Sequence, residues 1–152
     1  MSNLSCAKGF TLMEMLITVG IIGVIAAVGY PSYIASTQKS GRAEAKAELT
    51  DVAQRLQRCY TTLGVFNDAV NCPVLAELAA NGGLGIQTRG RGFYMISLAA
   101  NPALSAVAFQ LNAVPTAGLP QVQDVKCALF TLNQAGVRSA FDSNNVTNTM
   151  CW

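Results

Sequence analysis

The chain has 152 residues, of which 51% are hydrophobic and only 12% are charged, about half the charged fraction of an ordinary soluble domain. Ten Lys and Arg residues stand against eight Asp and Glu residues, and histidine is absent, so the formal net charge is +2. This length allows one modest domain. The missing histidine excludes Ser-His-Asp and Cys-His catalysis, and the weak positive balance is not typical of a dedicated nucleic-acid binder.

The first predicted element is a hydrophobic helix over residues 10–28, which carries a single charge, on Glu14. Such a helix would be about 29 Å long, enough to cross a hydrocarbon core of roughly 30 Å. The alternative interpretation is an ordinary secretory signal peptide, with residues 1–9 as its polar start and a cleavage site near Ala26 and Ala27. The apolar run is long for such a signal. A carboxylate inside it costs about 2.5–3.5 kcal/mol at a membrane centre, so Glu14 needs a partner.

The residues that open this helix resemble a known processing signal. The sequence Lys8-Gly9-Phe10-Thr11-Leu12-Met13-Glu14 is similar to the class III signal of type IV pilins and pseudopilins. In that family a short polar leader ends in Gly and is followed by Phe-Thr-Leu-x-Glu and a hydrophobic helix. The resemblance implies that a membrane-embedded aspartyl prepilin peptidase cuts between Gly9 and Phe10 and that Phe10 is then N-methylated.

Glu14 is the expected assembly residue. Cleavage would place an ammonium at Phe10, at the positive end of the helix dipole, where a cation is disfavoured. Glu14 lies four residues further on, with its side chain on the same helix face. In a bundle of such helices, the carboxylate of one subunit would neutralise the ammonium of its neighbour and set the axial register. The alternative is a Glu14 side chain that merely reaches the membrane interface.

A kink is expected at Pro31, because proline cannot donate a backbone hydrogen bond within the helix. Tyr30-Pro31-Ser32-Tyr33 resembles the helix-kink region of minor pilins. Three glycines nearby each lower the helix propensity by about 1 kcal/mol relative to Ala; they are Gly20, Gly23 and Gly29. The resemblance implies that this stretch partly melts when a filament assembles.

Beyond the kink, residues 39–60 predict an amphipathic helix, because apolar residues recur at the spacing of one buried face. Residues 64–92 form a connector with a short helix at 74–80. Strands are predicted at 93–98, 107–112 and 127–132, with a weaker one at 137–140. A long helix followed by antiparallel strands is an α+β arrangement, in which the helix covers one face of a four-stranded meander. The pilin resemblance implies the same fold.

The expected organisation has three parts. Residues 1–9 are a leader removed by the prepilin peptidase, residues 10–38 are a transmembrane and filament-core helix, and residues 39–152 are a periplasmic or extracellular globular domain. The resemblance implies a single-pass protein of the bacterial inner membrane that later enters an extracellular pilus.

Five cysteines are present, and Cys6 falls in the leader. The even set that remains favours disulfides in an exported domain; it consists of Cys59, Cys72, Cys127 and Cys151. Three pairings are open. We favour Cys59–Cys72 together with Cys127–Cys151, because many pilins have a C-terminal loop closed by a disulfide. A zinc site is disfavoured, since the chain has neither a Cys-x-x-Cys motif nor a histidine.

The C-terminal part extends the resemblance. Residues 124–137 and the closing Cys151-Trp152 are similar to a block common in PilE-like minor pilins, although Ala128 stands where that block usually has Gly. The leading hypothesis is therefore a minor type IV pilin that takes part in pilus assembly, twitching motility, adhesion and DNA uptake. The alternatives are a major type IV pilin, a pseudopilin of a type II secretion system, and a bitopic membrane protein with a periplasmic binding domain.

The sequence shows no motif typical of catalytic, cofactor-binding or metal-binding sites, so the chain is not expected to be an enzyme. The expected partners are other pilin subunits, the pilus assembly machinery and the prepilin peptidase. Arg89 and Arg91 lie beside Phe93, where they are candidates for contact with phosphates or another anionic surface; a solvated loop is the simpler interpretation. Loss of Lys8 lowers the formal charge from +2 to +1, which disfavours a DNA receptor.

Overall fold

The structure is a computed structural model that describes residues 10–152, apart from the side chains at positions 81 and 82. The predicted leader and its Gly9 cleavage position lie outside the described residues. The chain divides into two compact units between Thr37 and Gln38. Helix α1 (Leu12–Leu63) contributes its first half to one unit and its second half to the other.

The first unit consists of the N-terminal half of α1. The helix begins after Thr11, whose Oγ1 accepts a hydrogen bond from the backbone N–H of Glu14 at 3.2 Å. This Thr-x-x-Glu pattern is typical of a helix N-terminus. The helix continues through Pro31 without a break, so the expected kink or melting there stays a prediction for the assembled state.

In the second unit, the rest of α1 buries one face of the helix. Leu49, Val52 and Leu56 have no exposed surface, as the amphipathic pattern predicted. The helix ends at Leu63, where Gly64 adopts a positive φ of 76° and donates to the Tyr60 carbonyl at 2.8 Å. Glycine is the residue that takes this left-handed helix-terminating conformation most readily.

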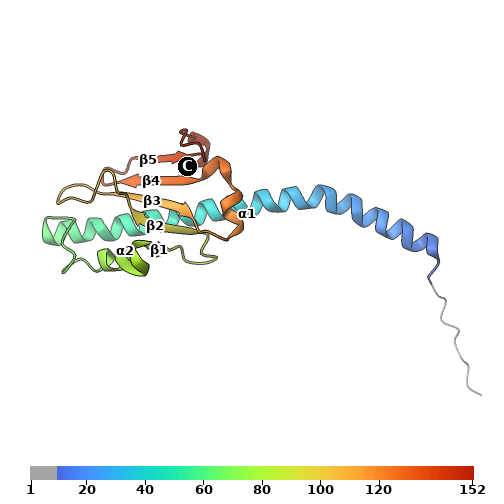
Figure 1. Cartoon of the computed structure of the whole chain (residues 1–152), viewed down its shortest axis with the longest axis horizontal. Coiled ribbons are helices and arrows are strands. Elements are labelled where there is room, and N and C mark those ends of the chain that lie inside the picture. The colour runs from blue at the N-terminus through green and yellow to red at the C-terminus, as the bar shows by residue number, and fades with distance from the viewer. Residues whose placement is uncertain (1–9) are drawn as a thin grey trace, which may run out of the picture. The chain divides into compact units, whose positions relative to one another are not determined.

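Five antiparallel strands form one sheet in the order β1-β2-β3-β4-β5 (Figure 1). After α2 (Pro73–Gly83), the strands are β1 (Ile86–Gln87), β2 (Tyr94–Leu98), β3 (Gln110–Pro115), β4 (Leu129–Asn133) and β5 (Arg138–Phe141). Short 3₁₀ turns occupy Pro120–Gln123, Val125–Cys127 and Thr149–Cys151. The predicted α+β meander is therefore confirmed in its class and order.

The predicted number of four strands was wrong, because β1 is a fifth strand. It pairs with β2 through Ile86 and Gln87 alone, and two residues are too few to show the alternation that identifies a strand. The predicted strand at 107–112 also begins later, at Gln110. A turn comes first, in which the N–H of Ser105 donates to the Ala108 carbonyl at 2.9 Å.

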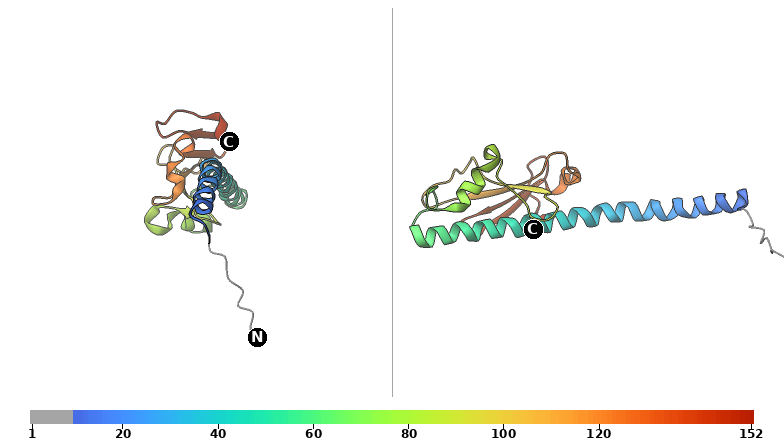
Figure 2. Two further views of the ribbon diagram at one scale, coloured as in Figure 1. Left: turned by 90° about the vertical axis from the view of Figure 1, so that its right-hand side faces the viewer. Right: turned by 90° about the horizontal axis from the view of Figure 1, so that it is seen from below.

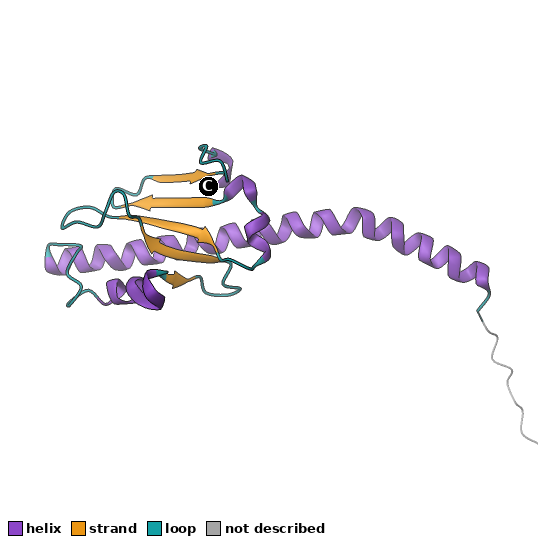
Figure 3. Cartoon of the chain, viewed as in Figure 1, coloured by secondary structure: helices purple, strands orange, loops and turns teal. Residues whose placement is uncertain are grey.

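The core lies between α1 and one face of the sheet. Inward-facing residues of the strands are buried against α1 and α2; they include Tyr94, Ile96, Leu111, Ala113, Phe130 and Leu132. Figure 2 and Figure 3 show the second half of α1 running along this face of the strands. Both favoured disulfides are present: Cys59–Cys72 joins the end of α1 to the start of α2, and Cys127–Cys151 closes the C-terminal loop.

Candidate functional site

The first half of α1 carries an uncovered apolar surface. Its most apolar 18-residue window has a mean hydropathy of 2.2, and by length and composition the helix could cross a membrane. Large apolar side chains are exposed along it, among them Leu12 at 79%, and Phe10 just before the helix is also 79% exposed. Because so large an apolar surface is unfavourable in water, it requires a membrane or other helices around it.

Two features of this segment bear on helix packing. A Cβ added at Gly20, Gly23 or Gly29 would meet nothing within 4 Å, so close approach by another helix is sterically open there. Glu14 is exposed and forms no ion pair with any described residue. The structure therefore leaves Glu14 available to a partner. Of the two predicted processing residues, Phe10 is the first described residue, and Gly9 lies outside the described residues.

A buried ion pair connects α1 to the turns before β4. Arg42 donates to Asp124 through Nε and Nη2, both at 2.7 Å, and the Asp124 side chain is only 2% exposed. The hydrogen bond to Asp124 raises the pKa of Arg42. A pair with two parallel hydrogen bonds fixes the orientation of both groups, so it sets where α1 meets the turn at residues 120–127.

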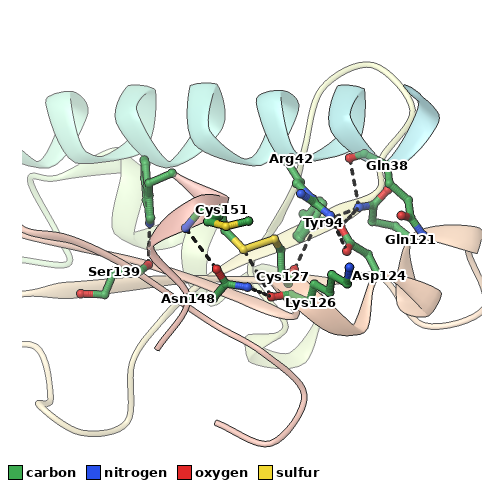
Figure 4. Close-up of a disulfide and its surroundings, with 12 residues drawn as sticks. Gln38, Arg42, Tyr94, Gln121, Asp124, Lys126, Cys127, Ser139, Asn148 and Cys151 are labelled. Atoms are coloured by element: carbon green, nitrogen blue, oxygen red, sulfur yellow. Dashed lines mark hydrogen bonds and ion pairs between the residues drawn. A yellow bond between two sulfur atoms is a disulfide. The ribbon is translucent and has the colours of Figure 1, made fainter. Parts of the chain in front are cut away.

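Gln121 completes this cluster (Figure 4). Its amide Nε2 donates to Asp124 Oδ2 at 3.0 Å, to Tyr94 Oη at 3.0 Å and to the Gln38 carbonyl at 3.3 Å. Burial raises the pKa of Tyr94 to about 12. We call Arg42, Tyr94, Gln121 and Asp124 the anchor cluster; it ties the start of the second unit's helix to the sheet.

The C-terminal loop is held in place by more than its disulfide. Asn148 Nδ2 donates to the Lys126 carbonyl at 3.1 Å (Figure 4). Trp152 Nε1 donates to the Ser139 carbonyl at 2.6 Å. The Trp152 ring also packs edge-on against Phe130, with 5.8 Å between the ring centroids. These contacts fix the indole in one position beside β5.

The loop with the two predicted contact arginines is ordered by carboxylates of α1. Glu44 accepts hydrogen bonds from the Thr88 hydroxyl and from the N–H groups of Arg91, Gly92 and Phe93. Glu48 accepts from the N–H of Arg89 at 3.4 Å. This role was not predicted from the sequence, although the i, i+4 spacing of the two glutamates on α1 puts them on one helix face.

The two arginines differ in their surroundings. Arg89 lies 3.8 Å from Glu48 Oε1 and 3.8 Å from Asp51 Oδ2, so carboxylates neutralise its charge. Arg91 is exposed, and its Cζ lies 5.7 Å from the centre of the Phe93 ring. Within the described chain, Arg91 has no ion pair, so only one of the two predicted contact residues keeps a free charge.

A second basic feature lies between α1 and β5, in a groove of about 460 Å³. Lys46 Nζ lies 5.9 Å from the ring centres of both Phe130 and Trp152, and Arg138 Cζ lies 5.4 Å from that of Trp152. Burial, and then the charge of Arg42, lower the pKa of Lys46. Sequence reasoning missed this groove, because its basic residues come from segments far apart in the chain.

Metal binding has no support in the described residues, which contain no group of three or more His, Cys, Asp or Glu side chains placed to hold an ion. The carboxylates of Glu44 and Glu48 accept hydrogen bonds from backbone N–H groups of the 88–93 loop.

An apolar first helix half, an amphipathic second half on an antiparallel meander, and a disulfide-closed C-terminal loop define the class of type IV pilins. Residues 4–30 match the family described as the prokaryotic N-terminal methylation motif. Residues 31–131 match the family described as "Type IV minor pilin ComP, DNA uptake sequence receptor". The chain belongs to this minor pilin family.

Two further similarities agree with this class. The chain is 30% identical over 117 residues to the type IV major pilin protein PilA of Myxococcus xanthus (strain DK1622), an alignment that covers 77% of this chain and 49% of PilA. The chain thus spans about half the length of that curated relative. Its fold is similar to the crystal structure of the non-core minor pilin PilV of Neisseria meningitidis, with a TM-score of 0.50, 20% identity, and coverage of 75% of this chain and 96% of PilV.

The two family matches confirm the predicted type IV pilin and its minor-pilin character. Pilins are structural subunits rather than enzymes. As a type IV pilin with an apolar N-terminal helix, the chain is anchored in the inner membrane before it becomes part of an extracellular pilus.

Proposed function

We propose that this chain is a minor pilin that enters the pilus through α1 and binds DNA with its second unit, as a subunit without enzymatic activity. The match of residues 31–131 to a family described as a DNA uptake sequence receptor carries this proposal. The expectation against DNA binding used only the total charge, whereas contact with DNA depends on where cations stand free.

The distribution of ion pairs supports DNA binding. Three basic residues of the described chain are in ion pairs with carboxylates, namely Arg42, Arg55 and Arg89. The other basic residues in the described part of the chain have none; they are Lys39, Lys46, Arg58, Arg91, Lys126 and Arg138. Free cations on a surface supply the phosphate contacts that dominate affinity for DNA.

DNA binding is tested with the full chain in a nonionic detergent, by fluorescence anisotropy of a labelled DNA duplex. We expect binding at about 50 mM salt that weakens as the salt concentration rises, because each neutralised phosphate releases counterions. The anisotropy measured with another pilin subunit that has no such free cations gives the baseline. Anisotropy that stays at this baseline at low salt would refute the DNA-binding part of the proposal.

Assembly follows from the N-terminal segment. In this proposal residues 1–9 are removed after Gly9, residues 10–38 enter the membrane and then the filament core, and residues 39–152 form the exposed part. The methylated Phe10 ammonium pairs with Glu14 of a neighbouring subunit, and Pro31 marks the stretch that melts. The prepilin peptidase and other pilins are the partners, and twitching motility and adhesion remain expected roles of the pilus.

Mass spectrometry of sheared pili tests the assembly step. The recovered chain should begin at a methylated Phe10 and should be unprocessed in a strain without prepilin peptidase. Glu14→Gln should be processed normally but lost from the filament, because a neutral side chain cannot pair with the ammonium. The matched control is Thr18→Val on the same helix, whose hydroxyl only donates to the Met15 carbonyl. Equal recovery of both variants would contradict a role for Glu14.

A further inference from the structure

The groove between α1 and β5 presents two cations without a carboxylate partner in the described chain. Its walls are Lys46, Ala47, Thr50, Asp51, Gln54, Arg138 and Trp152. Asp51 is the only acidic member, and it lies 3.9 Å from Arg55 and 3.8 Å from Arg89. Its charge is therefore shared with other cations, and Lys46 and Arg138 dominate the field inside the groove.

Lys46 is held in a position that favours a bound anion. Its ammonium lies near two aromatic rings, and burial together with the charge of Arg42 lowers its pKa. A cation that is partly removed from water and near another cation is destabilised. A negatively charged ligand in the groove would reverse this effect, because an opposite charge at contact distance favours the charged form.

The groove is also rigid where the cations meet. Trp152 contacts both cations, and its N–H is already used by the Ser139 carbonyl. The disulfide between Cys127 and Cys151 restrains the residue next to it. The indole therefore offers its apolar ring and no free donor, and the donors that face a ligand are the ammonium of Lys46 and the guanidinium of Arg138.

We propose that this groove binds a backbone phosphate of DNA between Lys46 and Arg138, with Trp152 as the fixed wall that positions both cations. The inference rests on the proposed DNA-binding function and adds its contact site. An ammonium supplies three N–H donors and a guanidinium five, which suits the acceptor oxygens of a phosphodiester. A volume of about 460 Å³ is ample for a phosphate and part of its sugar.

Trp152 provides a direct reporter, because it is the only tryptophan of the chain. In the full chain in detergent, a short DNA duplex should change Trp152 fluorescence over the same concentration range in which the anisotropy of a labelled duplex rises. Inorganic phosphate, titrated separately, should give a weaker change that the duplex abolishes by competition. A phosphate response that the duplex leaves intact would overturn DNA as the ligand of this groove.

Charge-neutralising variants test the two cations. Lys46→Gln and Arg138→Gln should each reduce the slope of log K against log salt by about 0.9, and the double variant by about 1.8. The matched control is Arg55→Gln, which removes one positive charge of α1 that is already in ion pairs with Glu77 and Asp51. Circular dichroism and the thermal midpoint of each variant establish that the fold is retained.

Three outcomes separate the groove from the function on which it rests. If duplex DNA binds but Trp152 fluorescence stays constant and both groove variants behave like Arg55→Gln, the groove proposal is overturned and DNA binding stands. If the wild-type chain binds no duplex, both fall. The site is supported if the slope of log K against log salt is smaller for the groove variants than for the control and if both groove variants weaken the Trp152 response.

Discussion

Gly41→Ala should destabilise the second unit, although the same change in an exposed helix stabilises by about 1 kcal/mol. A Cβ at position 41 would lie 2.5 Å from Gln121 Oε1, 2.9 Å from its Cδ and 3.0 Å from Phe93 Cδ2. Gln121 is 1% exposed and donates to two members of the anchor cluster, Tyr94 and Asp124, and to the Gln38 carbonyl. Glycine at this position is therefore required by the close approach of the Gln121 amide.

The expected size follows from these contacts. Overpacking costs about 1–3 kcal/mol, and displacement of Gln121 weakens hydrogen bonds that contribute about 1 kcal/mol each. After the gain in helix propensity is subtracted, the free energy of unfolding should fall by about 3 kcal/mol. For a unit of this size, that loss lowers the thermal midpoint by about 10 °C.

The assay is thermal unfolding of the full chain in detergent, followed by Trp152 fluorescence. Gly29→Ala is the matched control on the same helix, where a Cβ meets nothing within 4 Å, and its midpoint should not fall. In a Gln121→Ala background, Gly41→Ala should cost less than about 1 kcal/mol, because the two positions are coupled. A Gly41→Ala variant as stable as wild type would refute the role assigned to the anchor cluster.

Three further predictions concern the same unit. Replacing Cys59 and Cys72 by Ser should lower the free energy of unfolding by about 3 kcal/mol through the lost restraint on the loop. Replacing Cys127 and Cys151 by Ser should in addition weaken the Trp152 response to DNA. Equal Trp152 responses in the two double variants would contradict this. Glu44→Gln should raise hydrogen exchange at the Gly92 and Phe93 amides by about tenfold, with Glu77→Gln as the control that leaves them protected. Tyr94 has a pKa raised to about 12, so between pH 10 and 12 the folded state keeps the Tyr94 proton while the unfolded state, with a pKa near 10, loses it. The free energy of unfolding should therefore fall as the pH rises from about 10 to 12. Tyr94→Phe should flatten this fall in a pH series of unfolding midpoints.

Periodicity predicted the elements whose burial repeats along the chain. The apolar spacing of Leu49, Val52 and Leu56 is a property of one helix, so it is visible in the sequence. β2, β4 and β5 were expected within a few residues of their observed bounds, because each follows a turn. β1 escaped this reasoning, since its two residues become a strand only through pairing with Met95 and Ile96.

The site was harder to predict, because its members depend on tertiary contacts. The motif at the start of the chain predicts Glu14 as the assembly residue, and proline chemistry predicts a kink at Pro31; both predictions use local order alone. The interpretation of Arg89 and Arg91 as equivalent contacts ignored Glu48 and Asp51, which approach Arg89 from α1. The Lys46–Arg138 groove has no sequence signal, since only the packing of β5 and Trp152 against α1 brings its cations together.

The carboxylates of the second unit bear on the proposed DNA binding, which the total charge alone disfavours. From Gln38 to Trp152, nine basic residues stand against seven acidic ones, a small excess. Six of these carboxylates accept hydrogen bonds from donors of the chain itself: Asp124 from Arg42, Glu77 from Arg55, Glu44 and Glu48 from the 88–93 loop, and Asp68 and Asp142 from nearby backbone N–H groups. Asp51 lies in ion pairs with Arg55 and Arg89.

Outside ion pairs, six basic residues of this unit therefore stand against three carboxylates, those of Glu44, Asp68 and Asp142. These three carboxylates accept hydrogen bonds from backbone N–H groups and keep their negative charge. Attraction to a phosphate within a Debye length of about 8 Å depends on these local charges rather than on the total. A minor pilin of low net charge can in this way keep a small excess of cations where DNA would approach, and the salt slope of its variants measures how many of them take part.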